Sequence, residues 1–105
     1  MIALAMPEAT ESDHHGRASF RVSGRIFATL WTDRTINVMA GEERIRAAAE
    51  TRPEACREFL WGQRLAAVQV DLDRADADLL EDLLDHAWRR KASARVVREA
   101  VERRL

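Results

Sequence analysis

Residues 18–31 read ASFRVSGRIFATLW and carry the strongest β-sheet signal in the chain. Phe20 and Val22 alternate with polar residues, as in a strand with one buried face. The dipeptide at 23–24, Ser-Gly, follows as a two-residue turn, because glycine adopts positive φ without steric cost. Residues 26–31 are apolar on both faces, as in a central strand. The stretch therefore predicts a β-hairpin with two facing pairs, Val22 with Arg25 and Phe20 with Phe27.

The sequence around this hairpin predicts two further strands. Residues 7–18 are polar and rich in turn-forming residues, so we expect a connector before the hairpin. Residues 35–39 predict a third strand, with Ile36 and Val38 on one face. Residues 65–72 predict a fourth strand, whose apolar face would consist of Ala66, Val68, Val70 and Leu72.

A first helix is predicted in the middle of the chain. It begins after Gly41, where the carboxylates of Glu42 and Glu43 complement the helix dipole. It ends before Pro53, because the residue that precedes a proline disfavours helical angles. Residues 53–64 fit either one short helical turn or a loop, and the pattern leaves both open.

The last third of the chain predicts helical structure. A wide apolar stripe runs from Leu79 to Trp88, and Asp73 or Asp76 could cap the helix that carries it. The apolar pattern is interrupted after Trp88. A break with Ser93 as a new N-cap is favoured over one continuous helix, so residues 93–105 would form an extra C-terminal helix.

Length and composition fit one domain spanning residues 1–105, with 47% hydrophobic and 33% charged residues. We expect an α+β fold in which helices pack on one face of an antiparallel sheet of four to five strands. The single cysteine excludes an internal disulfide, and the N-terminal apolar run is too short for a signal peptide or a membrane span. Both features favour a cytoplasmic protein that does not bind membranes. Sixteen arginines against one lysine indicate a GC-rich genome, and a bacterial source is expected.

The net charge of −1 conceals two runs of opposite charge. Residues 71–85 contain seven acidic residues and one arginine, whereas residues 89–105 contain seven basic residues and two glutamates. The basic run has a simple structural explanation, because cations near a helix C-terminus offset its dipole. The molecule as a whole is therefore not strongly attracted to nucleic acid.

Four segments of the chain resemble a known family. They are residues 7–30 (PEATESDHHGRASFRVSGRIFATL), 61–62 (WG), 68–72 (VQVDL) and 79–88 (LLEDLLDHAW). Their order and spacing resemble the MmcQ/YjbR family from about Ala3 to Ala92. Family members usually begin with a longer helix that ends near the position of Pro7, so the first helix is expected to be short or missing here.

The resemblance implies a small two-layer α/β domain, similar to frataxin-like and secretion-chaperone-like folds. The family is often labelled DNA-binding because of its projecting β-hairpins, which have been compared to a double wing. The resemblance therefore implies a fold more directly than a function.

The residue types used in catalysis do not form a recognisable catalytic pattern. His14 and His15 are adjacent and would point to opposite faces of extended backbone, while His86 lies on a distant helix. Cys56 has no neighbouring histidine, and the acidic run at 71–85 lacks the calcium-binding loop pattern. We therefore expect no catalytic residue, no metal, no cofactor and no enzymatic activity.

The three tryptophans have different expected environments. Trp88 falls on the apolar helical stripe and is expected in the core. Trp61 precedes Gly62 in the pattern shared with the family, and it is expected to pack under the sheet. Trp31 ends a strand and is expected to be partly exposed.

Arginines on or beside the predicted turns are candidate ligands for phosphate groups: Arg17, Arg21, Arg25, Arg34 and Arg64. They would bind DNA weakly and without sequence preference. The same arginines also fit a solvated sheet face. A second interpretation therefore stays open, a protein-interaction domain that is chaperone-like or self-associates as a homodimer.

Overall fold

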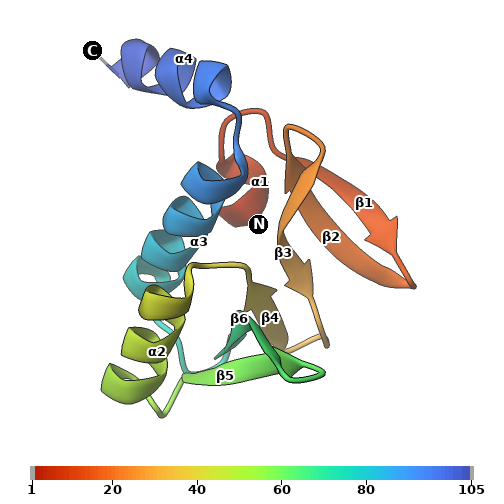
Figure 1. Ribbon diagram of the computed structural model, residues 1–105, viewed down its shortest axis with the longest axis vertical. Coiled ribbons are helices and arrows are strands. Elements are labelled where there is room, and N and C mark those ends of the chain that lie inside the picture. The colour runs from red at the N-terminus through yellow and green to blue at the C-terminus, as the bar shows by residue number, and fades with distance from the viewer. Residues whose placement is uncertain (1, 105) are drawn as a thin grey trace.

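The computed structural model describes residues 2–104, which form an antiparallel sheet with helices against one of its faces (Figure 1). In chain order the elements are α1 (Ile2–Ala5), β1 (Thr10–His14), β2 (Arg17–Val22), β3 (Arg25–Leu30), β4 (Thr35–Val38), α2 (Glu42–Thr51), β5 (Cys56–Trp61), β6 (Arg64–Asp71), α3 (Ala77–Lys91) and α4 (Ala94–Arg104). Within the described residues the sheet has six strands in the order β1-β2-β3-β4-β6-β5. No helix in this range is long and apolar enough to cross a membrane.

The hairpin of β2 and β3 confirms the predicted turn and corrects the predicted pairing. Ser23 and Gly24 have φ angles of 53° and 75°, and Val22 faces Arg25. Further along, however, a β-bulge on β3 pairs Phe20 with Ala28 instead of Phe27. Because a bulge sets two residues against one, Phe27 and Ala28 are both completely buried in the core beneath the helices.

The expectation of four to five strands was too low, because two strands lie in segments predicted otherwise. Residues 10–14 form β1 instead of a connector, and residues 56–61 form β5 instead of a helical turn or loop. Every residue of β1 is exposed, so no apolar alternation marks it. In β5 the apolar residues Cys56, Phe59 and Leu60 have helix-like spacing, but pairing with β6 determines the conformation.

The two predicted helical regions are confirmed. In α2, Ile45 and Ala48 are buried as expected. In α3, Asp76 is the N-cap and accepts a hydrogen bond of 2.8 Å from the backbone N–H of Leu79. Helix α3 ends at Lys91. The Ser93 hydroxyl accepts a 3.3 Å hydrogen bond from the backbone N–H of Val96 at the start of α4, as the predicted break requires.

The core lies between the sheet and the helices, and Val96 and Ala100 of α4 also belong to it. Its fully buried side chains include Phe20, Val22, Phe27, Ile36, Val38, Val68, Val70, Leu83 and Leu84. Trp88 belongs to this core as predicted, with 2% of its surface exposed. Its indole N–H donates a 2.9 Å bond to the carbonyl of Pro7 and so holds the segment after α1 against α3. The helices cover one sheet face only, which leaves the other available for a site.

Candidate functional site

A row of polar side chains crosses all six strands on the sheet face that the helices leave open. Strand register places its members side by side: Ser12, Ser19, Thr29, Asn37, Gln69 and Arg57, from β1 to β5. Three of them are nearly inaccessible to solvent, at 0% for Ser19, 4% for Thr29 and 1% for Asn37. Because no helix covers this face of the sheet, neighbouring side chains must bury these three polar groups.

Hydrogen bonds satisfy both ends of this polar row. The Ser19 hydroxyl donates to the carbonyl of Ser12 at 2.9 Å. At the other end, Arg57 Nε donates to Gln69 Oε1 at 3.0 Å, and Gln69 Nε2 donates to Asn37 Oδ1 at 3.0 Å. The Asn37 acceptor is thus occupied by Gln69, whereas the Asn37 amide nitrogen and the neighbouring Thr29 hydroxyl take no part in this chain of hydrogen bonds.

Thr29 and Asn37 form the floor of a cavity of about 400 Å³. Its walls are largely aromatic and aliphatic, contributed by Ile26, Trp31, Met39, Phe59, Trp61, Ala66 and Ala67. A second bulge, opposite Phe59 and Leu60, gives β6 its extra residue and turns both Ala66 and Ala67 toward this cavity. The predicted face of the fourth strand was therefore correct for Val68 and Val70, which are buried in the core, and wrong for Ala66.

Three aromatic rings form one wall of the cavity. The ring of Trp31 lies 5.0 Å from that of Phe59 and 6.5 Å from that of Trp61, and both contacts are edge-to-face. Trp31 is partly exposed, as predicted. The expectation that Trp61 packs under the sheet is wrong, because its side chain is 68% exposed at the end of β5. A hairpin tip has no neighbouring strand or helix to cover so large a ring.

Basic side chains lie beside this wall. Arg17 stacks its guanidinium 3.9 Å from the centre of the Trp31 ring, and its Nε donates to the Trp31 carbonyl at 3.0 Å. Arg64 also lines the cavity, as do His14 and His15 at the turn between β1 and β2. The cavity therefore combines a polar floor, an aromatic wall and a basic edge.

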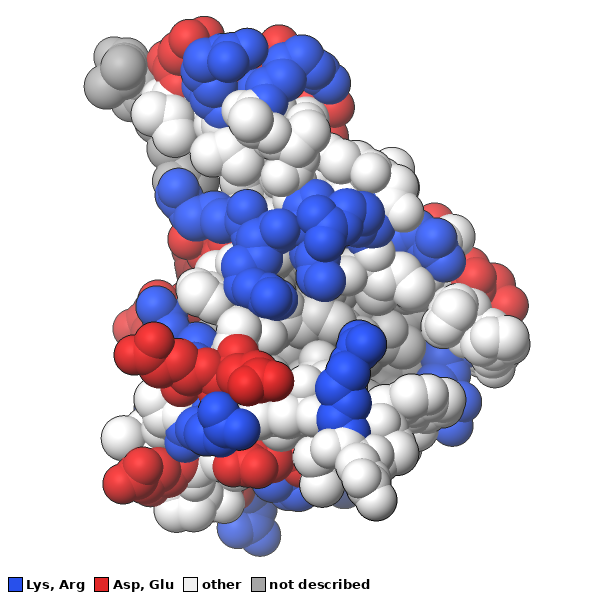
Figure 2. Space-filling view, viewed as in Figure 1, with Lys and Arg blue, Asp and Glu red and all other residues white. Residues whose placement is uncertain are grey.

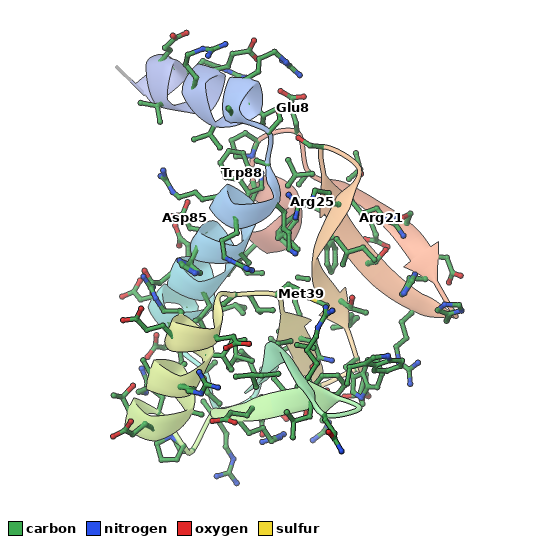
Figure 3. The ribbon with its side chains drawn as sticks, viewed as in Figure 1. Glu8, Arg21, Arg25, Met39, Asp85 and Trp88 are labelled. Carbon is green, nitrogen blue, oxygen red and sulfur yellow. The ribbon has the colours of Figure 1, made fainter. Side chains whose placement is uncertain are left out.

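Arg64 and three further cationic residues, Arg25, Arg90 and Lys91, define a surface that we call the basic rim. Partial burial lowers the pKa of Lys91, and the charges of Arg90, Arg25 and Arg64 lower it further. Arg90 donates a 2.8 Å bond to the carbonyl of Met39, a cavity residue. Figure 2 shows Lys and Arg side chains as a blue band across the middle of the molecule, and Figure 3 labels Arg25 and Met39 in the same view.

The structure brings together some of the five candidate arginines and not others. Arg17 and Arg64 both line the cavity, whereas Arg25 does not line it and belongs only to the basic rim. Arg21 lies on the same sheet face, with its Nε 3.4 Å from the Ser19 hydroxyl. Arg34 forms an ion pair of 3.3 Å with Asp73 and does not line the cavity.

Sequence reasoning missed Phe59 and the two cations at the end of α3, Arg90 and Lys91. The sequence of residues 53–64 fits either a helical turn or a loop, and neither conformation gives Phe59 a sheet face. The positive charge of Arg90 and Lys91 was visible in the basic run, but the helix dipole offered a sufficient explanation for it. Only the fold places the end of α3 beside the two hairpins.

The other candidate residues do not form a reactive cluster. Cys56 is buried as predicted, and burial raises the pKa of its thiol. Within residues 2–104, no three side chains of His, Cys, Asp or Glu are grouped so that they could hold a metal ion. Five acidic residues of the run at 71–85 are paired with arginines, namely Asp71, Asp73, Asp76, Asp82 and Asp85.

Comparison with known proteins identifies a family but no individual relative. No curated protein and no solved structure matches the chain. A protein-family model, YjbR, matches residues 4–90, which include all six strands and α2, and nearly all of α3. The match stops before α4. Because it covers most of the sequence, the chain belongs to the YjbR family.

Proposed function

We propose that this protein is a non-enzymatic DNA-binding domain whose contact surface is the open sheet face together with the basic rim. One observation carries the proposal. The rim cations and Arg17 form no ion pair with a carboxylate in the part of the chain that the structure describes, although many other arginines do. Burial is the main cause of the lowered pKa of Lys91, and repulsion by Arg90, Arg25 and Arg64 lowers it further; a phosphate backbone would relieve that repulsion.

The chemistry of these contacts favours binding without sequence preference. Guanidinium and ammonium groups recognise phosphate oxygens, which are the same at every nucleotide. The rim residues come from the β2–β3 turn, the β5–β6 hairpin and the end of α3, so they could follow a backbone across the face. Affinity from a few such contacts is weak at physiological salt, with a dissociation constant of about a micromolar or higher.

The test is a titration of fluorescently labelled DNA, both duplex and single-stranded, at low salt. Wild type is compared with a rim variant carrying Arg25→Ala, Arg64→Ala and Lys91→Ala. The matched control removes the same charge from arginines that are already paired, Arg34→Ala, Arg44→Ala and Arg74→Ala. We expect the rim variant to lose about tenfold or more in affinity and the control to lose much less. Equal losses, or no binding by wild type, would contradict the proposal.

A protein-interaction domain is the second candidate, and a specific feature favours it. Leu60 and Trp61 are 55% and 68% exposed on β5, which is an edge strand. Exposed apolar groups on an unpaired strand edge are typical of a contact with another chain, including a second copy. Self-association that is abolished by Leu60→Ala with Trp61→Ala, and is insensitive to salt, would support this candidate over DNA binding.

A further inference from the structure

We propose that the cavity on the open sheet face holds one unstacked base of single-stranded DNA, while the basic rim binds the phosphates on either side of it. The inference rests on the proposed function and specifies its substrate. A base in a duplex is paired and stacked on both sides, so it cannot enter a cavity. The site would therefore select a single strand over a duplex.

The aromatic wall provides the surface on which a base would stack. Trp61 exposes 68% of its side chain, so a face of its ring is open to a planar ligand. Trp31 contacts the Trp61 ring edge-to-face, and Phe59 contacts Trp31 in the same way. Stacking on an aromatic side chain strengthens single-strand binding by about 5- to 150-fold per base and tolerates every base, since each has a π-face.

The cavity floor provides polar groups for the edge of the base. Thr29 and Asn37 are both at least 96% buried and both line the cavity. Because Asn37 Oδ1 already accepts from Gln69, what remains toward the cavity is the amide N–H donor, and beside it is the Thr29 hydroxyl. A donor and a hydroxyl match the carbonyl and N–H groups of a pyrimidine such as thymine. The volume of about 400 Å³ lies within the range usual for small-ligand sites.

The charges around the cavity are placed for the phosphates of such a strand. Arg17, held over Trp31, and Arg64 both line the cavity, and Arg90 of the basic rim donates to the carbonyl of Met39, another lining residue. The acidic residues of α3 that line a separate hollow, Asp78, Glu81, Asp82 and Asp85, do not line this cavity. An anionic strand with one base inserted therefore meets complementary charge at the cavity edge.

The experiment compares two strands that carry the same phosphates. One is an oligothymidylate of about twelve nucleotides, a length within the usual site sizes. The other has the same length but abasic sites in place of the bases. Fluorescence anisotropy at low salt should show that wild type binds the thymidylate strand about 5- to 150-fold more tightly than the abasic strand.

Three variants separate the base site from the phosphate sites. Trp61→Ala should remove the preference for the thymidylate strand and leave abasic binding unchanged. Leu60→Ala removes a neighbouring exposed side chain that does not line the cavity, so the preference should persist. Thr29→Val keeps the shape of the side chain without its hydroxyl and should reduce the preference in part.

The possible results distinguish the two proposals. If wild type binds both strands equally, the base site is wrong, whereas binding of DNA through the basic rim still stands. If Trp61→Ala and Leu60→Ala reduce the preference equally, the base site is also wrong. If wild type binds neither strand, the proposed function fails and the base site fails with it.

Discussion

His86 of α3 is joined to the N-cap residue of α2 by a single hydrogen bond. Its Nε2 accepts the backbone N–H of Gly41 at 3.3 Å, which requires that nitrogen to be unprotonated. Burial lowers the pKa of His86, and the charges of Arg44 and Arg90 lower it further against the opposing effect of Asp82 and Asp85. The neutral imidazole is therefore the form that the fold stabilises.

This environment predicts a pH dependence of stability. Because the folded pKa is depressed, the unfolded chain takes up the proton first as pH falls. The stabilisation is fully present above the unfolded pKa of about 6.5 and is lost as pH falls through the folded value. The free energy of unfolding in urea should fall less steeply for His86→Gln than for wild type between about pH 7.5 and about pH 5. The glutamine amide oxygen can still accept the hydrogen bond from Gly41 but does not take up a proton. His14→Gln controls for removing an exposed imidazole, and parallel curves for wild type and His86→Gln would contradict the prediction.

Single residues of the candidate site were the hardest to place from sequence. Thr29 and Asn37 are polar and Trp61 is aromatic, yet the first two are buried and the third is exposed. Residue type predicts the reverse in each case. The difference arises because cross-strand neighbours enclose Thr29 and Asn37, whereas Trp61 lies beyond the last covering element. Neither circumstance is encoded near these residues in the chain.

Among the elements, the β2–β3 hairpin illustrates what local sequence can determine. Ser23 and Gly24 both have positive φ, the combination that a two-residue hairpin turn requires, and their identity predicted it. The bulge two residues later was not predictable, because it depends on how Phe27 and Ala28 fit beneath α3. The edge strand β1 had no apolar pattern that could reveal it.

The turn gives a direct test of this hairpin. Gly24 has a φ of +75°, and a Cβ added there would meet no atom within 4 Å. Gly24→Val should therefore destabilise the protein through backbone strain alone, by roughly 1–3 kcal/mol in urea unfolding. Gly24→Asn is the matched variant, because asparagine tolerates this conformation and should cost much less. Similar stability of the Val and Asn variants would show that strain at Gly24 is unimportant.

Over the whole molecule, charge is separated in a way that the net value of −1 does not convey. Acidic side chains of α3 line their own shallow hollow, and most of the acidic run at 71–85 is neutralised by arginines. The basic rim lies elsewhere, without such partners. Sequence identified Arg25 and Arg64 as candidates, but their meeting with Lys91 depends on the packing of α3 against the sheet.

This separation makes the salt dependence of binding the property that best distinguishes the candidate functions. Five cations are available for phosphates, Arg17 and the four of the basic rim, and each contact with a single strand releases counterions that contribute about 0.7 to the slope. A plot of log affinity against log salt should therefore fall with a slope of about −3.5. Lys91→Gln should reduce the steepness by about 0.7, because one phosphate contact is lost. Arg74→Ala removes a cation already paired with Asp71 and should leave the slope unchanged. A slope near zero for wild type would instead indicate an apolar contact, and the exposed side chains of Leu60 and Trp61 would then be the place to look for a protein partner.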